Sequence, residues 1–299
     1  MRRVALAGGS GRIGAALQRY WTGGGTEVVR LVRRPAGAPG EVEWDPAAGR
    51  VDGARLADCD VLVNLAGENI AGGRWTAERK RQLRESRLQA TSALAAAVAG
   101  GPWRPQVWIN ASAVGYYGDA GETVLDENAP QGSGFLATLC GDWERATRPA
   151  EAAGVRVVRL RLGVVLEAGG GALAKLLPVF RAGVGGPVGD GRQWLSWIGR
   201  DELCRVVDTV ARDDRFSGAV NAVAPEPVRN AEFAAVLSRV LRRPAVVRAP
   251  AWAVGAALGE LGRETVLASQ RAVPRALLAH GFDFAPGGLE SALRAALTE

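Results

Sequence analysis

The chain has 299 residues, of which 47% are hydrophobic, so it is long enough to bury the core of one large or two smaller domains. It contains no run of about 18 apolar residues and its N-terminal apolar run is too short for a signal peptide, so we expect a soluble cytoplasmic protein without a membrane partner. The net charge of +6 is spread along the chain without a basic block interleaved with aromatic residues, which argues against a nucleic-acid partner.

Cysteine and histidine are too scarce and too scattered for several kinds of site. Cys59, Cys140 and Cys204 lie far apart and show no CxxC spacing, which argues against a zinc site and a disulfide framework. His280 is the only histidine, so histidine-based triads and multi-histidine metal sites are excluded. Its place after an apolar stretch is typical of a helix C-terminus, where a cation suits the helix dipole. We therefore expect no metal ion.

The most informative stretch lies near the start of the chain, where RVALAGGSGRIG occupies residues 3–14. An apolar strand ends at a glycine-rich turn, and a helix begins directly after it. Gly8 allows a turn at positive φ, Gly11 lets the backbone approach a pyrophosphate, and Gly14 lets the helix pack close to the strand. The alternative is a glycine-rich turn without a ligand. We predict that a dinucleotide binds at this turn and at the helix N-terminus, through Gly8, Gly9, Ser10, Gly11, Arg12, Ile13 and Gly14.

Strands and helices alternate along the rest of the chain, which predicts a doubly wound parallel α/β sheet, the Rossmann fold. The patterns indicate further strands at residues 27–32, 42–44, 60–65, 107–111, 155–160, 194–198, 219–223 and 245–248. They indicate helices at residues 76–99, 140–153, 173–180, 201–210, 230–241, 252–261, 276–278 and 289–297, with Thr76, Asp201 and Asn230 as caps.

The pattern changes at Pro244, after which only a short strand and small helices follow. We therefore expect an NAD(P)-binding Rossmann domain at residues 1–243 and a small C-terminal α+β substrate domain at residues 244–299. The glycine-rich segment around residues 163–200 is expected to line the substrate cleft.

The end of the second expected strand indicates which cofactor binds. Arg33 and Arg34 stand there, about twenty residues after the last glycine of the turn. An acidic residue at this place would hold a ribose 2′-hydroxyl, whereas arginine would hold a 2′-phosphate through charge-assisted hydrogen bonds. The two arginines favour NADP(H), with NADPH preferred over NADH; two solvated arginines are the alternative.

Two further strand ends carry candidate site residues. Leu65, Ala66 and Gly67 end the strand at residues 60–65, and small side chains there let the cofactor ribose approach, since open α/β sheets bind ligands at carboxyl ends of strands. Ser112 ends the strand at residues 107–111, and Tyr116 and Tyr117 follow it; their hydroxyl groups are candidates for hydrogen bonds to a carbonyl substrate. Packing against the core or the cofactor is the alternative for both tyrosines.

Several segments of the chain are distinctive in combination: GGSGRIG, NLAGENIAGGRW, SRLQAT, SAVGYYG, CGDWE, RLGVVL, WLSWI and GFDFAPGGLESAL. With them the chain resembles the extended short-chain dehydrogenase/reductase superfamily, in particular its NAD-dependent epimerase/dehydratase-like branch of nucleoside-diphosphate-sugar-epimerase-like proteins with a small extra C-terminal domain. The resemblance covers essentially the whole chain. It implies a Rossmann fold, an NAD(P) cofactor and a cleft between two domains.

The chain departs from the superfamily at the place of greatest chemical importance. The resemblance implies a Tyr-x-x-x-Lys pair, in which the lysine lowers the tyrosine pKa and holds the nicotinamide ribose. Counting back from Trp143 and Glu144 puts the pair at about Leu136 and Cys140: leucine has no proton to transfer, and cysteine has no fixed positive charge. The branch also commonly has histidine where this chain has Gly199. We interpret Cys140 as a buried structural thiol, because no histidine is available as its base.

Two functions follow from these observations. The first is an NADP(H)-dependent oxidoreductase or epimerase-like enzyme with an atypical site, acting on a carbonyl, alcohol or nucleotide-sugar-like substrate, with Ser112 and Tyr116 or Tyr117 supplying hydrogen bonds. The second is a protein that holds NADP(H) without turnover, as a sensor or scaffold. The substrate stays open, and so does the oligomeric state, for which a homodimer is one expectation.

Overall fold

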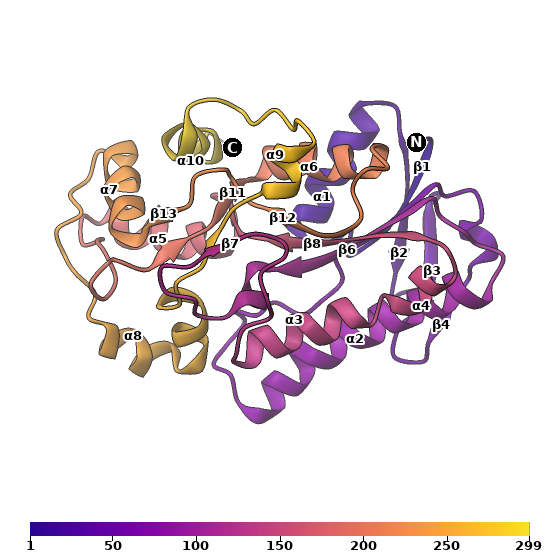
Figure 1. The fold of residues 1–299 in the computed structure, drawn as a ribbon, viewed down its shortest axis with the longest axis horizontal. Helices are drawn as coiled ribbons and strands as arrows, with labels where there is room; N and C mark the ends of the chain where they lie inside the picture. The colour runs from indigo at the N-terminus through magenta and orange to yellow at the C-terminus, as the bar shows by residue number, and fades with distance from the viewer. Residues whose placement is uncertain (299) are drawn as a thin grey trace.

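The computed structural model describes residues 1–298, and an eight-stranded sheet lies at its centre (Figure 1). The strand order is β12-β8-β6-β5-β1-β2-β3-β4, and every pairing is parallel except that of β3 with β4. The chain moves outward from β1 first to one side and then to the other, so the expected doubly wound fold is confirmed. The strands of this sheet are β1 (Arg3–Ala7), β2 (Glu27–Val32), β3 (Glu41–Asp45), β4 (Arg50–Val51), β5 (Val61–Asn64), β6 (Val107–Ala113), β8 (Arg156–Leu162) and β12 (Gly218–Ala222).

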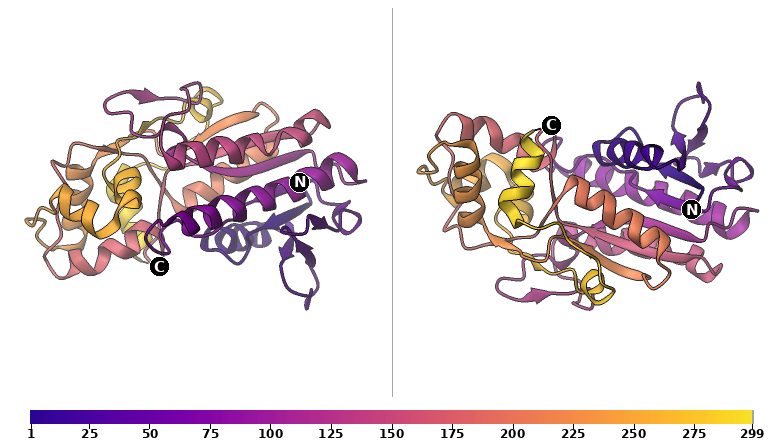
Figure 2. Two further views of the ribbon diagram at one scale, coloured as in Figure 1. Left: turned by 90° about the horizontal axis from the view of Figure 1, so that it is seen from below. Right: turned by 90° about the horizontal axis from the view of Figure 1, so that it is seen from above.

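Helices cover both faces of the sheet (Figure 2). One face packs against α1 (Arg12–Gly23) and α6 (Arg200–Arg212), and the other against α2 (Ala77–Gly100), α3 (Phe135–Arg145) and α4 (Arg148–Ala152). The central strands therefore have no exposed face, and all four residues of β5 are buried. This burial explains the nearly continuous apolar runs that the sequence shows in these strands.

One of the three expected helix caps is present. The hydroxyl of Thr76 accepts a hydrogen bond from the Arg79 N–H at 3.1 Å and starts α2 as expected. The other two predictions are wrong. Asp201 already lies in the first turn of α6, which follows Gly199, and Asn230 instead accepts a hydrogen bond from the N–H of Val188. The Asp201 carboxylate binds the adjacent Arg200 instead of a backbone N–H, and the Asn230 side chain binds a distant segment.

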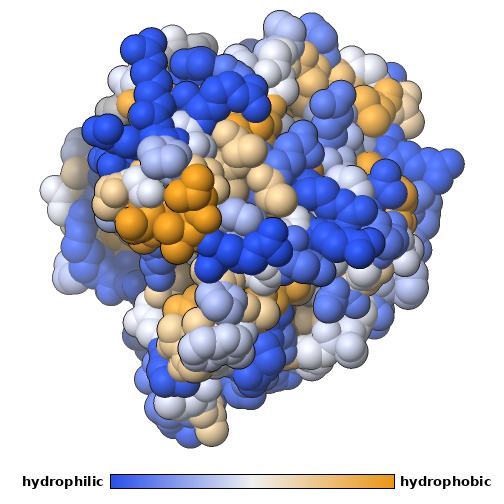
Figure 3. Space-filling view, turned by 90° about the vertical axis from the view of Figure 1, so that its left-hand side faces the viewer, coloured by the Kyte–Doolittle hydropathy of each residue, from blue (hydrophilic) through white to orange (hydrophobic). Residues whose placement is uncertain are grey.

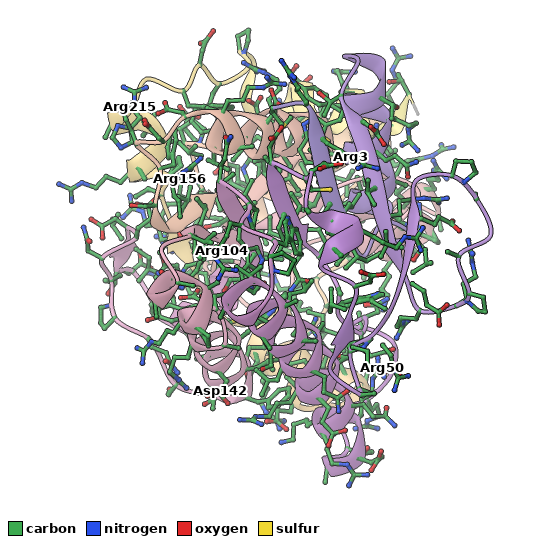
Figure 4. The ribbon with its side chains drawn as sticks, turned by 90° about the vertical axis from the view of Figure 1, so that its right-hand side faces the viewer. Arg3, Arg50, Arg104, Asp142, Arg156 and Arg215 are labelled. Carbon is green, nitrogen blue, oxygen red and sulfur yellow. The ribbon has the colours of Figure 1, made fainter. Side chains whose placement is uncertain are left out.

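The two ends of the sheet differ in what lies beyond them. Figure 4 looks onto the side that carries Arg3, Arg104 and Arg156. Arg3 and Arg156 open β1 and β8, and Arg104 precedes β6, so this side holds the amino ends of the strands. The carboxyl ends point the opposite way, toward the smaller unit of the molecule (Figure 1).

The smaller unit has its own hydrophobic core, built mainly from α5 (Gly171–Arg181), α7 (Asn230–Leu241) and α10 (Gly288–Leu297). Leu173, Phe233 and Leu293 are among its buried residues. Two of these helices, α5 and α7, precede the expected domain boundary at residue 243, and α10 follows it. The remaining helical elements are η1 (Ala54–Leu56), η2 (Val114–Tyr117), α8 (Ala251–Leu258), η3 (Gly262–Val266) and α9 (Arg275–Ala279).

Two expected strands take a different form in this unit. Residues 194–198 divide into β10 (Trp194–Leu195) and β11 (Trp197–Gly199), which pair with different partners. Residues 245–248 form no strand, and Val246 is 78% exposed, so the apolar pattern was misleading there. The short strands of the molecule are completed by β7 (Val124–Leu125), β9 (Val164–Leu166), β13 (Val228–Arg229) and β14 (Arg271–Ala272).

The surface of the smaller unit mixes apolar and polar patches (Figure 3). None of the residues of α8 is buried, and Trp252 is 77% exposed. Within residues 1–298, no helix combines the length and apolar character needed to cross a bilayer.

Candidate cofactor and active site

The glycine-rich turn between β1 and α1 fits closely between neighbouring backbone segments. Gly8 has φ +83°, and a Cβ added there would lie 2.8 Å from the carbonyl carbon of Leu65. A Cβ on Gly14 would lie 2.4 Å from the carbonyl oxygen of Gly8. The expected roles of these two glycines, the positive φ and the close packing of helix on strand, are confirmed.

The N-terminus of α1 offers hydrogen-bond donors. Gly11 precedes the helix, and its own N–H donates to the carbonyl of Gly8 at 3.0 Å. Among residues 1–298, no acceptor takes the N–H groups of Arg12, Ile13 or Gly14. Unpaired N–H groups at a helix N-terminus favour a bound anion, so this turn fits the pyrophosphate of a dinucleotide.

The carboxyl end of β5 lies against this turn. The N–H of Leu65 donates to the carbonyl of Ala7 at 2.9 Å, and the N–H of Ala66 donates to Oδ1 of Asn64 at 3.1 Å. Asn64 is fully buried and is held by Asn110. Leu65 and Ala66 therefore lie beside Gly8, and the contact with the cofactor ribose expected of them stays a prediction.

The two arginines after β2 differ from each other. Arg34 donates two hydrogen bonds to the carboxylate of Glu41, at 2.9 and 2.6 Å, and this bonding lowers the pKa of Glu41 to about 2. Arg30 also pairs with this carboxylate, at 2.6 Å. Arg33 is exposed and makes no hydrogen bond or ion pair with any part of the chain that the structure describes. Arg33 is therefore the arginine that is available to a ligand.

Ser112 and Tyr117 belong to a buried polar network under α3. The Ser112 hydroxyl donates to Oε1 of Glu144 at 2.7 Å, and Glu144 accepts two hydrogen bonds from Arg161, each at 2.9 Å. Arg161 also donates to the Tyr117 hydroxyl at 3.0 Å, and that hydroxyl donates to Oδ1 of Asn221 at 2.7 Å. Each of these five residues is at most 7% exposed. We call them the Glu144 network.

These contacts affect the two candidate catalytic residues. Ser112 is 1% exposed, so its hydroxyl is engaged beneath α3. Burial raises the pKa of Tyr117 to about 12, against smaller opposing effects of Arg161 and Asn221. Both side chains stabilise the fold in this structure, and a catalytic role for either stays a prediction.

Tyr116 has a different environment. It is half-buried, the guanidinium of Arg161 lies 3.6 Å from its ring centroid, and its hydroxyl has no hydrogen-bond partner among residues 1–298. The ring borders a polar cavity of about 260 Å³ that no residue of the glycine-rich turn lines. The other residues of this cavity are Gln131, Gly141, Glu144, Arg145, Arg148, Arg159, Arg161 and Ala219.

The residues expected at the places of the missing Tyr-x-x-x-Lys pair, Leu136 and Cys140, lie on α3. Leu136 packs close to Gly115, at 3.3 Å from the site of an added Cβ. Cys140 is 3% exposed, and burial raises the pKa of its thiol to about 11. The expected burial of this thiol is confirmed, and the raised pKa keeps it protonated at neutral pH.

Glu144, Arg161 and Asn221 were not predicted as site residues from the sequence. The only local signal was a charged residue at every second position in the second half of β8, whose run is RVVRLRL. Alternation places Arg159 and Arg161 on the same face. Their partner Glu144 comes from a different element, which no local pattern reveals.

Nowhere in residues 1–298 do three or more His, Cys, Asp or Glu side chains gather as metal ligands. The three cysteines are free and buried.

A second cavity, of about 510 Å³, lies at the edge of the sheet and includes none of the predicted site residues: it is lined by Val124, Asp126, Val273, Arg275, Leu278 and Ala279.

The fold and the glycine-rich turn together define a dinucleotide-binding α/β protein. Comparison with known families agrees: residues 4–222 match the model of the NAD dependent epimerase/dehydratase family, and residues 249–296 match a domain of unknown function. The chain therefore belongs to the NAD-dependent epimerase/dehydratase family, which confirms the resemblance inferred from its motifs.

Similar proteins extend over the full chain. An epimerase family protein of Mycobacterium bovis, Mb2239, is 45% identical over 99% of this chain and 97% of its own length. The human epimerase family protein SDR39U1 is 36% identical over 98% of both chains. A crystal structure of human SDR39U1 with NADPH superposes with a TM-score of 0.89 at 34% identity, and 99% of each chain is covered.

Proposed function

We propose that the protein binds NADPH and transfers a hydride between this cofactor and a small carbonyl or alcohol substrate. The observation that carries the proposal is the set of unpaired N–H groups of Arg12, Ile13 and Gly14, beside the exit of β5. The similarity to human SDR39U1, whose structure contains NADPH, supports the choice of cofactor.

The residues of this chain would divide the work of binding. The N–H groups of α1 would hold the pyrophosphate, and Arg33 would hold the 2′-phosphate through charge-assisted hydrogen bonds. Bound NADPH would supply the hydride. Tyr116 is the candidate for a hydrogen bond to the substrate oxygen, because its hydroxyl is neither fully buried nor bonded to the described residues, unlike those of Ser112 and Tyr117.

A fluorescence titration with NADPH and NADH tests the cofactor assignment. We expect NADPH to bind at least about tenfold more tightly, and Arg33→Ala to remove this difference. Arg34→Ala is the matched control, because Arg34 is held by Glu41 and its loss should leave the difference largely intact. Equal affinity of the unaltered protein for both cofactors would overturn the assignment to NADPH.

A second function is supported by one observation. Leu136 and Cys140 occupy the places of the proton-transfer pair, which favours a protein that holds NADPH as a sensor without turnover. Oxidation of bound NADPH by a panel of aldehydes, ketones and nucleotide sugars separates the two functions. Turnover that Tyr116→Phe removes would support the enzyme, and no turnover across the panel would support the sensor.

A further inference from the structure

The absence of the lysine at Cys140 leaves the site without its usual cation, but another cation lies close by. Arg87 extends from α2, and its positive charge is one of the influences that lower the pKa of the Cys140 thiol, against the larger effect of burial. Its guanidinium also lies over the ring of Trp143, 5.1 Å from the centroid. Arg87 therefore reaches from α2 to α3, the helix that carries Cys140.

Arg87 reaches the carboxyl edge of the sheet. A Cβ added to Gly67, which follows β5, would lie 3.2 Å from Cζ and 3.4 Å from Nε of this arginine. Its terminal nitrogens donate to the carbonyls of Leu83, at 3.0 Å, and Glu68, at 2.9 Å. These two bonds hold the guanidinium against the backbone segment at which open α/β sheets bind their ligands.

The guanidinium of Arg87 forms no ion pair with a carboxylate of the described residues. Among the ion pairs formed by residues 1–298, none includes Arg87, and the nearby carboxylate of Glu68 pairs instead with Arg79 at 3.3 Å. Burial lowers the pKa of Arg87, yet a guanidinium stays protonated in proteins. A largely buried cation without a counter-ion is costly, so its persistence at the ligand-binding edge is explained if a ligand completes its environment.

We propose that Arg87 takes the place of the missing lysine and holds the nicotinamide ribose of the cofactor from α2 instead of from α3. The remaining N–H groups of the guanidinium would donate to the ribose hydroxyls. The guanidinium would also supply the positive charge that the lysine normally provides and that Cys140 lacks. This inference rests on the proposed binding of NADPH.

Two ligands separate this role from a general one. NADPH contains the nicotinamide ribose, whereas adenosine 2′,5′-bisphosphate carries only the adenosine half with its phosphates. We expect Arg87→Met to weaken NADPH about ten- to hundredfold and to leave adenosine 2′,5′-bisphosphate within about threefold. Arg33→Ala should weaken both ligands, because its expected contact is the 2′-phosphate.

Two further variants exclude a merely structural effect. Arg79→Met is the matched control: Arg79 lies on the same helix and also holds Glu68 and the carbonyl of Asn69, so it anchors the same loop away from Gly67. We expect it to bind NADPH nearly as the unaltered protein does. Arg87→Lys is the conservative variant: it keeps the cation and should retain more of the NADPH affinity than Arg87→Met does. If Arg87→Met does not fold, Arg87→Gln takes its place as the variant without the charge.

The outcomes distinguish the two proposals. If the unaltered protein does not bind NADPH, the proposed function fails. If it binds NADPH and Arg87→Met, folded by circular dichroism and thermal denaturation, binds equally well, the role of Arg87 is wrong and the proposed function stands. Equal losses for both ligands, or a similar loss in Arg79→Met, would also overturn the contact to the ribose.

Discussion

The turn after β1 and the Glu144 network under α3 use polar groups in opposite ways. At the turn, the N–H groups of Arg12, Ile13 and Gly14 are fixed in place without acceptors from the described chain. In the Glu144 network, each of the five side chains has a hydrogen-bond partner within 3.0 Å. Donors held without acceptors indicate a place for a ligand, whereas donors that are all satisfied indicate a part of the folded core.

The largest effect is expected from breaking the network at its ion pair. Glu144→Gln leaves the Arg161 charge buried without its carboxylate, which should lower the free energy of unfolding by about 3–5 kcal/mol in urea denaturation. The double variant Glu144→Leu/Arg161→Met removes both charges and should recover much of that loss. A double variant less stable than the single one would show that the pair itself, and not the unpaired charge, decides stability.

A substitution at the turn should act on binding more than on stability. Gly14→Ala places a Cβ against the carbonyl of Gly8, so α1 must move away from β1 and its N–H groups lose their positions. We expect NADPH affinity to fall by about a hundredfold or more in a fluorescence titration. Gly23→Ala, at the open end of the same helix, is the control and should bind normally. Normal binding by Gly14→Ala would place the cofactor elsewhere.

The adjacent residues Tyr116 and Tyr117 allow a satisfied hydroxyl to be compared with an unsatisfied one, because each variant removes a single oxygen atom. Tyr117→Phe removes a hydroxyl bonded to Arg161 and Asn221, and should cost about 1–3 kcal/mol of stability. Tyr116→Phe removes a hydroxyl without a described partner and should change stability by less than about 0.5 kcal/mol. Chemical denaturation of both variants measures the difference. Equal losses would mean that the two hydroxyls are not in different environments.

The smallest effect concerns pH and the carboxylate that holds Arg34. The folded-state pKa of Glu41, about 2, lies below its ordinary value of 4.5. Its contribution to stability is therefore present above pH 4.5 and is lost as the pH falls toward 2. The stability difference between the unaltered protein and Glu41→Gln should shrink over this interval, as thermal denaturation across the pH range would measure. A constant difference would contradict the assigned pKa.

The sequence predicted the features that depend on neighbouring residues. Gly8 and Gly14 act within one turn, and the apolar strand at Val61–Asn64 is a local pattern, so both were identified correctly. The cap expected at Asn230 failed because its side chain binds the N–H of Val188, which comes from a distant segment. The cap expected at Asp201 failed because α6 begins one residue earlier, at Arg200, whose side chain binds the Asp201 carboxylate.

The Glu144 network could not be predicted from the sequence, because its members also come from distant segments. Ser112, Glu144 and Arg161 come from β6, α3 and β8, and they meet only once the sheet has formed. The difference between Arg33 and Arg34 also depends on Glu41 in the neighbouring strand. Adjacent residues of the same type can thus have different roles that only the tertiary structure separates.

The interleaved core of the smaller unit has a consequence for how the protein can be divided. Residues 249–296 match a separate family model, yet of the three helices that build this core they supply only α10. The other two, α5 and α7, lie earlier in the sequence, before that segment begins. A fragment limited to residues 249–296 would expose the apolar side of α10 to water. We therefore expect this segment to fold only together with the rest of the chain and not as an independent domain.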